Sequence, residues 1–202
     1  AVVEAMRNVA AVGATPHALS DCLCFGNPEK PHQMWEFVES VRGVAEACHA
    51  ISLKDNPDHA TPIIAGNVSF YNESKNGAIP PSPIVSCLGR LKDVNKTVPA
   101  HFQMSDSVII MIGERKDELG GSVYYSINNE LGANVPKPNL EEVRSQIFAL
   151  TDCIDGGMVL SCHDIADGGI ASALSEMTFC KGIGCKVTVE SHLSSNKILF
   201  SE

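Results

Sequence analysis

The sequence predicts an α/β fold, or an α+β variant of it, divided into two lobes. Short apolar runs of strand length alternate with segments whose apolar residues recur every three or four positions, as in helices. With 202 residues and 44% hydrophobic content, the chain is long enough to bury a substantial core. Between Lys92 and Ser105 it turns polar and irregular, which is typical of a boundary. We therefore assign residues 1–104 to a first lobe and residues 105–202 to a second.

The first lobe is predicted to contain two helices and three strands. Residues 1–12 form a helix that Gly13 ends, and residues 31–51 form a longer amphipathic helix that starts with a proline. A short strand at residues 17–23 should deliver Asp21 to the loop that follows it. Apolar runs at residues 63–65 and 83–89 predict two buried strands, with a turn at residues 76–77 between them.

The second lobe is predicted to be a layered α/β or α+β structure. Its apolar runs at residues 107–112, 158–162 and 186–189 read as strands. One helix is predicted to start at Asn139, a typical N-cap residue, and to stop at Gly156. A second helix follows the sequence His163-Asp-Ile-Ala-Asp-Gly-Gly169.

Composition and charge exclude several classes of function. The net charge of −9, without a cluster of Lys and Arg, argues against a nucleic-acid-binding surface. No apolar run approaches ~20 residues and no signal-peptide pattern occurs, so we expect no membrane span. The eight cysteines form no Cys-x-x-Cys motif and most lie in apolar runs, which favours a cytoplasmic protein over a disulfide framework or a zinc site. Because the chain starts directly in a helical pattern and stops at Leu199-Phe-Ser-Glu202, we expect a piece of a longer polypeptide.

The strongest candidate for a binding site is Gly66-Asn-Val-Ser69, which follows the strand at residues 63–65. Glycine lets a backbone approach a ligand closely, and amide and hydroxyl oxygens suit hard cations and hydrogen bonds. This composition fits a phosphate and magnesium site at the carboxyl end of a strand. Asp21 would meet the same cleft if the two strands are neighbours. The alternative is a polar turn and an aspartate that caps its own loop.

Two further segments carry polar groups just before a predicted helix. The segment His163–Gly169 offers a histidine, two acids and a helix N-terminus, and Glu118-Leu-Gly-Gly-Ser122 offers a pair of glycines. Both have structural alternatives: Asp167 as an N-cap beside a satisfied histidine, and a tight turn. Because no nucleophile elbow, P-loop or dinucleotide fingerprint is present, the residues alone assign no catalytic group.

A series of motifs resembles the second half of the synthetase subunit in the phosphoribosylformylglycinamidine synthase family, part of the aminoimidazole ribonucleotide synthetase-related superfamily. They occur in order over nearly the whole chain. The motifs are Arg7-Asn8 with Val12-Gly-Ala-Thr-Pro16, Asp21-Cys-Leu-Cys-Phe-Gly-Asn-Pro-Glu-Lys-Pro31, Gly66-Asn-Val-Ser-Phe-Tyr-Asn-Glu73, Ile79-Pro-Pro-Ser-Pro83, Glu118-Leu-Gly-Gly-Ser122, His163-Asp-Ile-Ala-Asp-Gly-Gly169 and Leu199-Phe-Ser-Glu202.

The resemblance implies a two-lobed ATP-binding synthetase fold, truncated at both ends, and an ATP-dependent carbon–nitrogen ligase that uses glutamine as amide donor. Its reaction converts formylglycinamide ribonucleotide, ATP and ammonia to formylglycinamidine ribonucleotide, ADP and phosphate. By position, Asp21 and Gly66 match ATP contacts, Asn67 matches a Mg²⁺ ligand and Ser69 matches a substrate contact. The catalytic histidine of the family belongs to the other half, so His163 is not that residue.

The implied partners are the first half of the synthetase subunit, a glutaminase subunit or domain, and a small accessory subunit. We expect the isolated chain to lack synthase activity and to be able to self-associate into a homodimer through surfaces that normally face the first half. Residues 54–59 look like an insertion that lengthens a surface loop. Two alternatives stay open: a non-catalytic nucleotide-binding or structural half, and another ATP-dependent enzyme of this fold, such as aminoimidazole ribonucleotide synthetase, selenophosphate synthetase or a hydrogenase-maturation protein.

Overall fold

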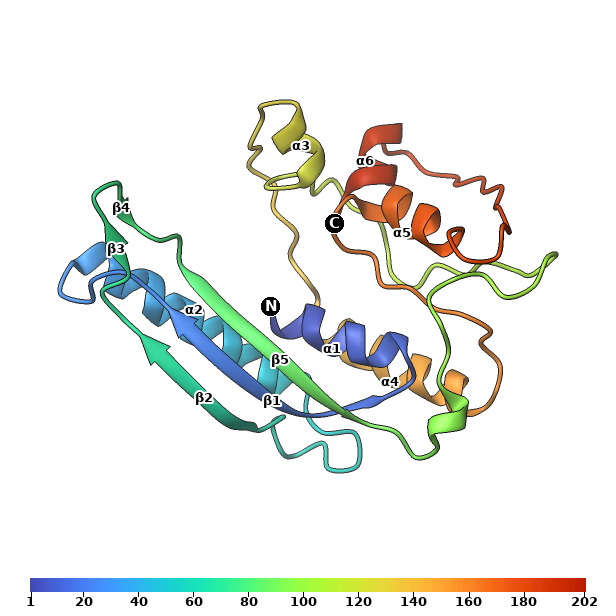
Figure 1. Ribbon diagram of the computed structural model, residues 1–202, viewed down its shortest axis with the longest axis horizontal. Coiled ribbons are helices and arrows are strands. Elements are labelled where there is room, and N and C mark those ends of the chain that lie inside the picture. The colour runs from blue at the N-terminus through green and yellow to red at the C-terminus, as the bar shows by residue number, and fades with distance from the viewer. The chain divides into compact units, whose positions relative to one another are not determined.

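The computed structural model describes residues 1–202, which fall into two compact units (Figure 1). Unit 1 comprises Ala1–Ala10, Ala14–Lys92 and Leu140–Phe148, and unit 2 comprises Ala11–Gly13, Asp93–Asn139 and Ala149–Glu202. The chain is mixed α and β, as the sequence predicts, and all of its strands lie in unit 1. The assignment of residues 1–104 and 105–202 to two lobes stays a prediction.

Unit 1 is built on β1 (Thr15–Cys24), the middle strand of a three-stranded sheet with the order β2-β1-β5. β2 (Ile63–Ser69) pairs with β1 in parallel, and β5 (Ser82–Arg90) pairs with it antiparallel. Parallel neighbours need a crossover, and α2 (Pro31–Ala50) supplies it between β1 and β2 (Figure 1). β3 (Glu73–Ser74) and β4 (Gly77–Ala78) form a small hairpin at the predicted turn.

Two helices complete the framework of unit 1. α1 (Val2–Ala11) confirms the first predicted helix, and Gly13 after it has a φ of +94°, which favours glycine. α2 confirms the helix predicted for residues 31–51. Its Phe37 packs edge-on against Phe25 and Phe70, with ring centroids 5.3 and 5.0 Å apart, so the helix is fastened where β1 and β2 end. The buried apolar residues of this unit are Val2, Met6, Ala10, Ala14, Ala18, Leu19, Phe25, Ala47, Cys48, Ile51, Ile147 and Phe148.

The strands of unit 1 are longer and more exposed than the sequence predicts. β1 continues through Asp21 to Cys24, so Asp21 lies within the strand and not in the following loop. β2 continues to Ser69 and is exposed along most of its length. β5 consists of half-buried and exposed residues. Both strands are present where the sequence predicts them, but the prediction that they are buried was wrong. β2 and β5 are edge strands, each with β1 on one side only, and this leaves much of their surface open.

Unit 2 is helical. It contains η1 (Val94–Lys96), α3 (Val123–Ile127), the later part of α4 (Leu140–Asp155), α5 (Gly169–Met177) and α6 (Ser195–Phe200). α4 and α5 confirm the two helices predicted here. None of the helices is both long and apolar enough to cross a membrane.

The strands predicted at residues 107–112, 158–162 and 186–189 are wrong, because none of these segments forms a strand. Val108 and Ile110 of the first segment are 84% and 79% exposed, far from the fully buried strand that was expected. An apolar run becomes a strand only where another strand satisfies its backbone amides and carbonyls. Unit 2 contains no such partner.

Residues 54–59 form the surface loop that the sequence predicts. The loop is closed by a hydrogen bond from the amide of Leu53 to the carbonyl of His59. Asp55 at its tip forms an ion pair with Arg90 of β5, at 3.0 Å. The loop is thus tied to the end of the sheet in spite of its exposure.

Replacing Phe25 with alanine should destabilise unit 1 strongly. Phe25 is 1% exposed and contacts Phe37, so its truncation leaves a cavity and removes an aromatic pair. We expect a loss of about 3–5 kcal/mol in the free energy of unfolding, measured by urea denaturation. Trp35→Ala is the matched control, since Trp35 is 60% exposed and should change stability by no more than about 0.5 kcal/mol. Equal losses in both variants would contradict this assignment of the core.

Candidate functional site

The pairing of β1 with β2 brings the predicted site residues onto neighbouring strands. In the parallel register, Asp21 lies opposite Gly66, Cys22 opposite Asn67, and Cys24 opposite Ser69. β1 and β2 are therefore adjacent strands, as the predicted cleft requires.

The side chains of these residues divide between the two faces of the sheet, because successive residues of a strand point to opposite sides. The carboxylate of Asp21 lies directly over Gly66, where a Cβ would overlap Asp21 Oδ1. Asn67 and Ser69 point to the other face, together with the cysteines of β1. The expected convergence of an acid, an amide and a hydroxyl in one cleft is thus not found. Asp21 and Gly66 form one pair, and Asn67 and Ser69 form another.

The face that carries Asp21 is the face that α2 covers. Burial, and to a smaller extent the negative charge of Asp21, raise the pKa of the Cys48 thiol of α2. The carboxylate itself is half-buried and lies beside a strand backbone that has no side chain at Gly66. A carboxylate and bare backbone groups can together accept and donate hydrogen bonds to a polar ligand.

Asn67 is exposed on the edge strand β2. Its amide oxygen is a suitable ligand for a hard cation such as Mg²⁺. No group of three or more His, Cys, Asp and Glu side chains gathers as a metal site in the chain. A cation at Asn67 would therefore take most of its ligands from phosphate oxygens, water or another chain, which is the usual mode for Mg²⁺.

Ser69 is already engaged by Asn72. Its Oγ lies 3.2 Å from Asn72 Oδ1 and 3.1 Å from Asn72 Nδ2, and the same Nδ2 donates to the carbonyls of Phe25 and Ser69 at 2.9 Å. Asn72 thus fastens the ends of β1 and β2 to the turn that follows them. Sequence reasoning assigned Asn72 no such role, although a serine and an asparagine three residues apart are a known signal for local side-chain to backbone bonding.

Several cysteine thiols have a raised pKa. The Sγ atoms of Cys22 and Cys24 lie 3.6 Å apart, and the hydrogen bond with Cys22 is the main cause that raises the pKa of Cys24. Burial raises the pKa of Cys87 and of Cys162. A raised pKa keeps a thiol protonated and unreactive. The thiols of Cys24, Cys87 and Cys162 are therefore poorly suited to act as nucleophiles.

Glu202 contacts the starts of two helices of unit 2. One carboxylate oxygen, Oε1, accepts hydrogen bonds from the amides of Val123, the first residue of α3, and of Gly168, the residue before α5, both at 2.9 Å. A Cβ on Gly169 would lie only 2.5 Å from the carbonyl oxygen of Leu199 and 2.7 Å from that of Ser201. The sequence placed these segments far apart, and only the position of Glu202 at the end of a motif indicated a role for it.

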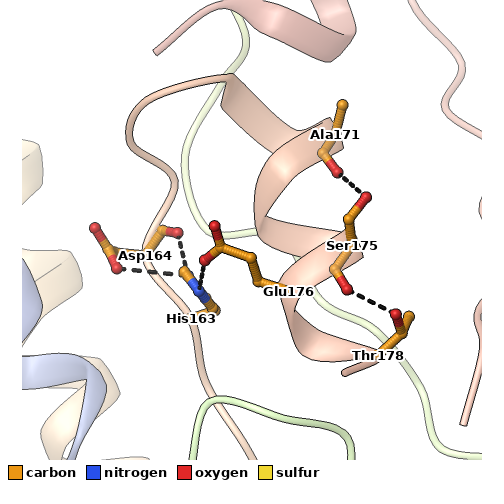
Figure 2. Close-up of polar contacts among 6 residues, drawn as sticks. All are labelled: His163, Asp164, Ala171, Ser175, Glu176 and Thr178. Carbon is orange, nitrogen blue, oxygen red and sulfur yellow. Dashed lines mark hydrogen bonds and ion pairs between the residues drawn. The ribbon is translucent and has the colours of Figure 1, made fainter. Parts of the chain in front are cut away.

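The segment before α5 differs in one respect from the prediction. The N-cap residue is Gly168, with a φ of +79° and no side-chain cap, so the assignment of Asp167 as the N-cap was wrong. The ring of His163 is held between Asp164 and Glu176, as Figure 2 shows. This agrees with a satisfied histidine, which was the structural alternative.

A methyl group at Gly66 should displace the Asp21 carboxylate. We expect Gly66→Ala to lower the free energy of unfolding by about 1–3 kcal/mol, and by clearly less when Asp21→Ala is also present, because the overlap is then gone. Gly43→Ala is the control: no atom lies within 4 Å of a Cβ there, and an alanine inside α2 should stabilise the chain by about 0.5–1 kcal/mol. Urea denaturation of the four variants measures the coupling. If Gly66→Ala lowers the free energy of unfolding by the same amount with and without Asp21→Ala, the two residues do not interact.

Removing the Glu202 side chain should loosen unit 2. Glu202→Ala leaves the amides of Val123 and Gly168 without their acceptor, so we expect a loss of about 1–3 kcal/mol. Glu202→Gln keeps an oxygen acceptor and loses only the favourable charge at the helix ends, about 0.3–1 kcal/mol. Thermal denaturation and hydrogen exchange of the two amides measure both effects. Equally fast exchange in the two variants would show that the charge, and not the hydrogen bonds, holds the segments together.

Comparison with protein families matches both parts of the chain. Residues 1–91 match the AIR synthase related protein, N-terminal domain, and residues 105–202 match the AIR synthase related protein, C-terminal domain. The phosphoribosylformylglycinamidine synthase subunit PurL of Methanothrix thermoacetophila is 45% identical over 205 residues, covering 100% of this chain and 27% of the relative. The same subunit of Alkaliphilus metalliredigens is 40% identical over 206 residues, covering 100% and 26%. The chain thus spans about a quarter of the length of these relatives.

The fold is also similar to a solved structure. PurL of Thermotoga maritima, complexed with FGAR, matches 100% of this chain and 32% of its own, with a TM-score of 0.70 and 17% identity. Structures of the same protein with ATP and within PurLQS match this chain with TM-scores of 0.47 and 0.39. With its two parts matching the two family domains and its full length homologous to PurL, the chain belongs to the AIR synthase related family.

Proposed function

We propose that the chain is the second-half segment of a PurL-type synthetase and supplies part of the site of an ATP-dependent carbon–nitrogen ligase. The reaction converts formylglycinamide ribonucleotide, ATP and glutamine-derived ammonia to formylglycinamidine ribonucleotide, ADP and phosphate. The observation that carries this proposal is the 45% identity with PurL over the whole chain. The FGAR complex of the T. maritima relative supports the choice of substrate.

Asp21 and Gly66 contact ATP, Asn67 binds Mg²⁺ and Ser69 contacts the ribonucleotide substrate. The register of β1 and β2 supports this assignment, since it places all four residues on paired strands. The four residues lie on opposite faces of the sheet, but they can still contact one bound ligand, because β2 is an edge strand. A ligand that lies along the open edge of β2 can reach groups on both of its faces.

The reaction requires positioning of the reactants and charge neutralisation, and it does not require a covalent nucleophile from the protein. In phosphoryl transfer the formamide oxygen takes the γ-phosphoryl group, ADP leaves, and ammonia then displaces phosphate at the same carbon. Bound Mg²⁺ would neutralise phosphate charge. The residues of this chain bind and orient the nucleotide and substrate, and burial favours the protonated thiol of Cys48 beside Asp21. No residue of the chain is assigned as catalytic.

The remaining parts of the machinery come from other segments. We propose as partners the first half of the synthetase, a glutaminase and a small accessory subunit, in a cytoplasmic assembly. The assembly of the T. maritima relative as PurLQS supports this. Since the chain spans about a quarter of PurL, it holds part of a site and has no synthase activity alone.

A second candidate is a non-catalytic structural half that supports its partner without binding ATP. The engagement of Ser69 by Asn72 favours it, because the hydroxyl then braces the strand ends instead of facing a ligand. The exposure of Asn67 favours the binding role.

Asn67→Leu should remove the magnesium dependence of ATP binding to the 202-residue chain. We expect binding of a fluorescent ATP analogue to weaken on the order of 10-fold or more in the presence of Mg²⁺, and to be unchanged with chelator. Asn56→Leu in the exposed loop is the control for an added surface leucine. Absence of ATP binding by the unaltered chain supports the structural candidate. ATP-dependent synthesis by the chain alone would refute the view that it holds only part of the site.

A further inference from the structure

We propose that Cys22 and Cys24 form a chelating dithiol, which binds one soft, thiophilic metal ion of the Zn²⁺ or Cd²⁺ type through both sulfur atoms. The pair belongs to β1, the middle strand of the sheet in unit 1. The site takes no part in the ligase reaction, and its ligand differs in kind from the hard Mg²⁺ ion proposed for Asn67.

The strand holds both thiols on one face of the sheet, because side chains two residues apart in a strand point to the same side. The Sγ atoms of Cys22 and Cys24 lie 3.6 Å apart. Two sulfur ligands of a tetrahedral ion, each about 2.3 Å from it, are separated by about 3.8 Å. The two thiols are therefore already placed to share one ion.

Hydrogen bonding on both sides of β1 fixes this spacing. Each of the two cysteines has one partner residue on β2 and one on β5 (Figure 1). Because the strand is held by both neighbours, neither cysteine can shift its backbone without breaking hydrogen bonds of the sheet. A metal site benefits from ligands that are held in place before the ion arrives. The sheet supplies this preorganisation.

The same spacing disfavours a disulfide between the two thiols. Residues two apart in an extended strand have Cα atoms roughly 6.6–6.8 Å apart, at the upper limit of the range that disulfides span. Drawing the sulfurs of Cys22 and Cys24 together from 3.6 Å to a covalent bond would require β1 to bend between its two neighbours. A shared ion needs no such bend, so the geometry favours chelation over oxidation.

A metal ion can reach the pair from solvent. α2 covers the opposite face of the sheet, the face that carries Asp21. On the cysteine face, Asn67 is exposed and Ile84 is 55% exposed, and these two residues flank Cys22. No third His, Cys, Asp or Glu side chain joins the two thiols. Water from the open face would therefore complete the coordination of the ion.

The ion has to displace a proton from each thiol. The hydrogen bond with Cys22 raises the pKa of Cys24, so this thiol is protonated in the metal-free chain. On binding, each S–H bond is replaced by a bond from sulfur to the metal, both protons pass to solvent, and no electron is transferred. Thiolate ligands select soft ions, so Mg²⁺ does not compete for the site.

Titration of the reduced 202-residue chain with Cd²⁺ tests the site. Bonds from thiolate to Cd²⁺ give an ultraviolet charge-transfer band, and we expect one tightly bound ion per chain and no such band with Mg²⁺. Cys22→Ser and Cys24→Ser should each weaken the binding of this ion on the order of 100-fold, because one sulfur of the chelate is lost. Cys180→Ser and Cys185→Ser, at two exposed cysteines, are the controls and should leave it unchanged.

The place of binding can also be found without any substitution. Trypsin releases Cys22 and Cys24 on one fragment, residues 8–42, which contains no other cysteine. Bound Cd²⁺ should protect both thiols of this fragment from alkylation by iodoacetamide, while the exposed Cys180 and Cys185 still react. Equal alkylation of the fragment with and without Cd²⁺, or tight binding that persists in both serine variants of β1, would overturn the proposal.

Discussion

Hydrogen bonding along β1 is the constraint on which unit 1 depends. This strand pairs with β2 on one side and with β5 on the other, and no other strand of the sheet has two partners. Its register decides that Asp21 lies opposite Gly66 and that Asn67 lies on the other face. A slip of one residue would exchange the faces of a whole strand, so the placement of every proposed binding residue follows from this pairing.

Around the sheet, α2 and the turn after β2 hold the strand ends in place. Phe37 contacts the aromatic rings that follow β1 and β2, and Asn72 bonds to the backbone at the ends of the same two strands. The proposed site therefore lies on braced strands, beside the open edge of β2. This suits a protein that positions a nucleotide and a substrate while other segments supply the remaining groups.

Unit 2 is organised by helix ends instead of by a sheet. The first amides of a helix have no partner within it, and a carboxylate at the same place also meets the positive end of the helix dipole. The carboxylate of Glu202 accepts hydrogen bonds from amides at the starts of both α3 and α5. It thereby joins segments that are far apart in the chain. His163 and Glu176 tie the other side of α5 to the segment before it. Contacts of this kind are made by polar and charged groups, unlike the apolar packing of unit 1.

The sequence by itself determined the four longest helices, the order of the first strands and the family. Helical periodicity with Pro31 at the start and glycines after the ends places α1, α2, α4 and α5, because these signals are local. Only the tertiary structure decided which apolar runs become strands, since a strand needs a partner that its own residues do not specify. The runs at 63–65 and 83–89 have β1 beside them, whereas those at 107–112, 158–162 and 186–189 have no strand to pair with. In the same way, the sequence indicated Asp21, Gly66, Asn67 and Ser69 as candidates, but only the strand pairing divides them between two faces of the sheet. The position of Glu202 between two helix ends likewise follows from contacts between residues far apart in the chain.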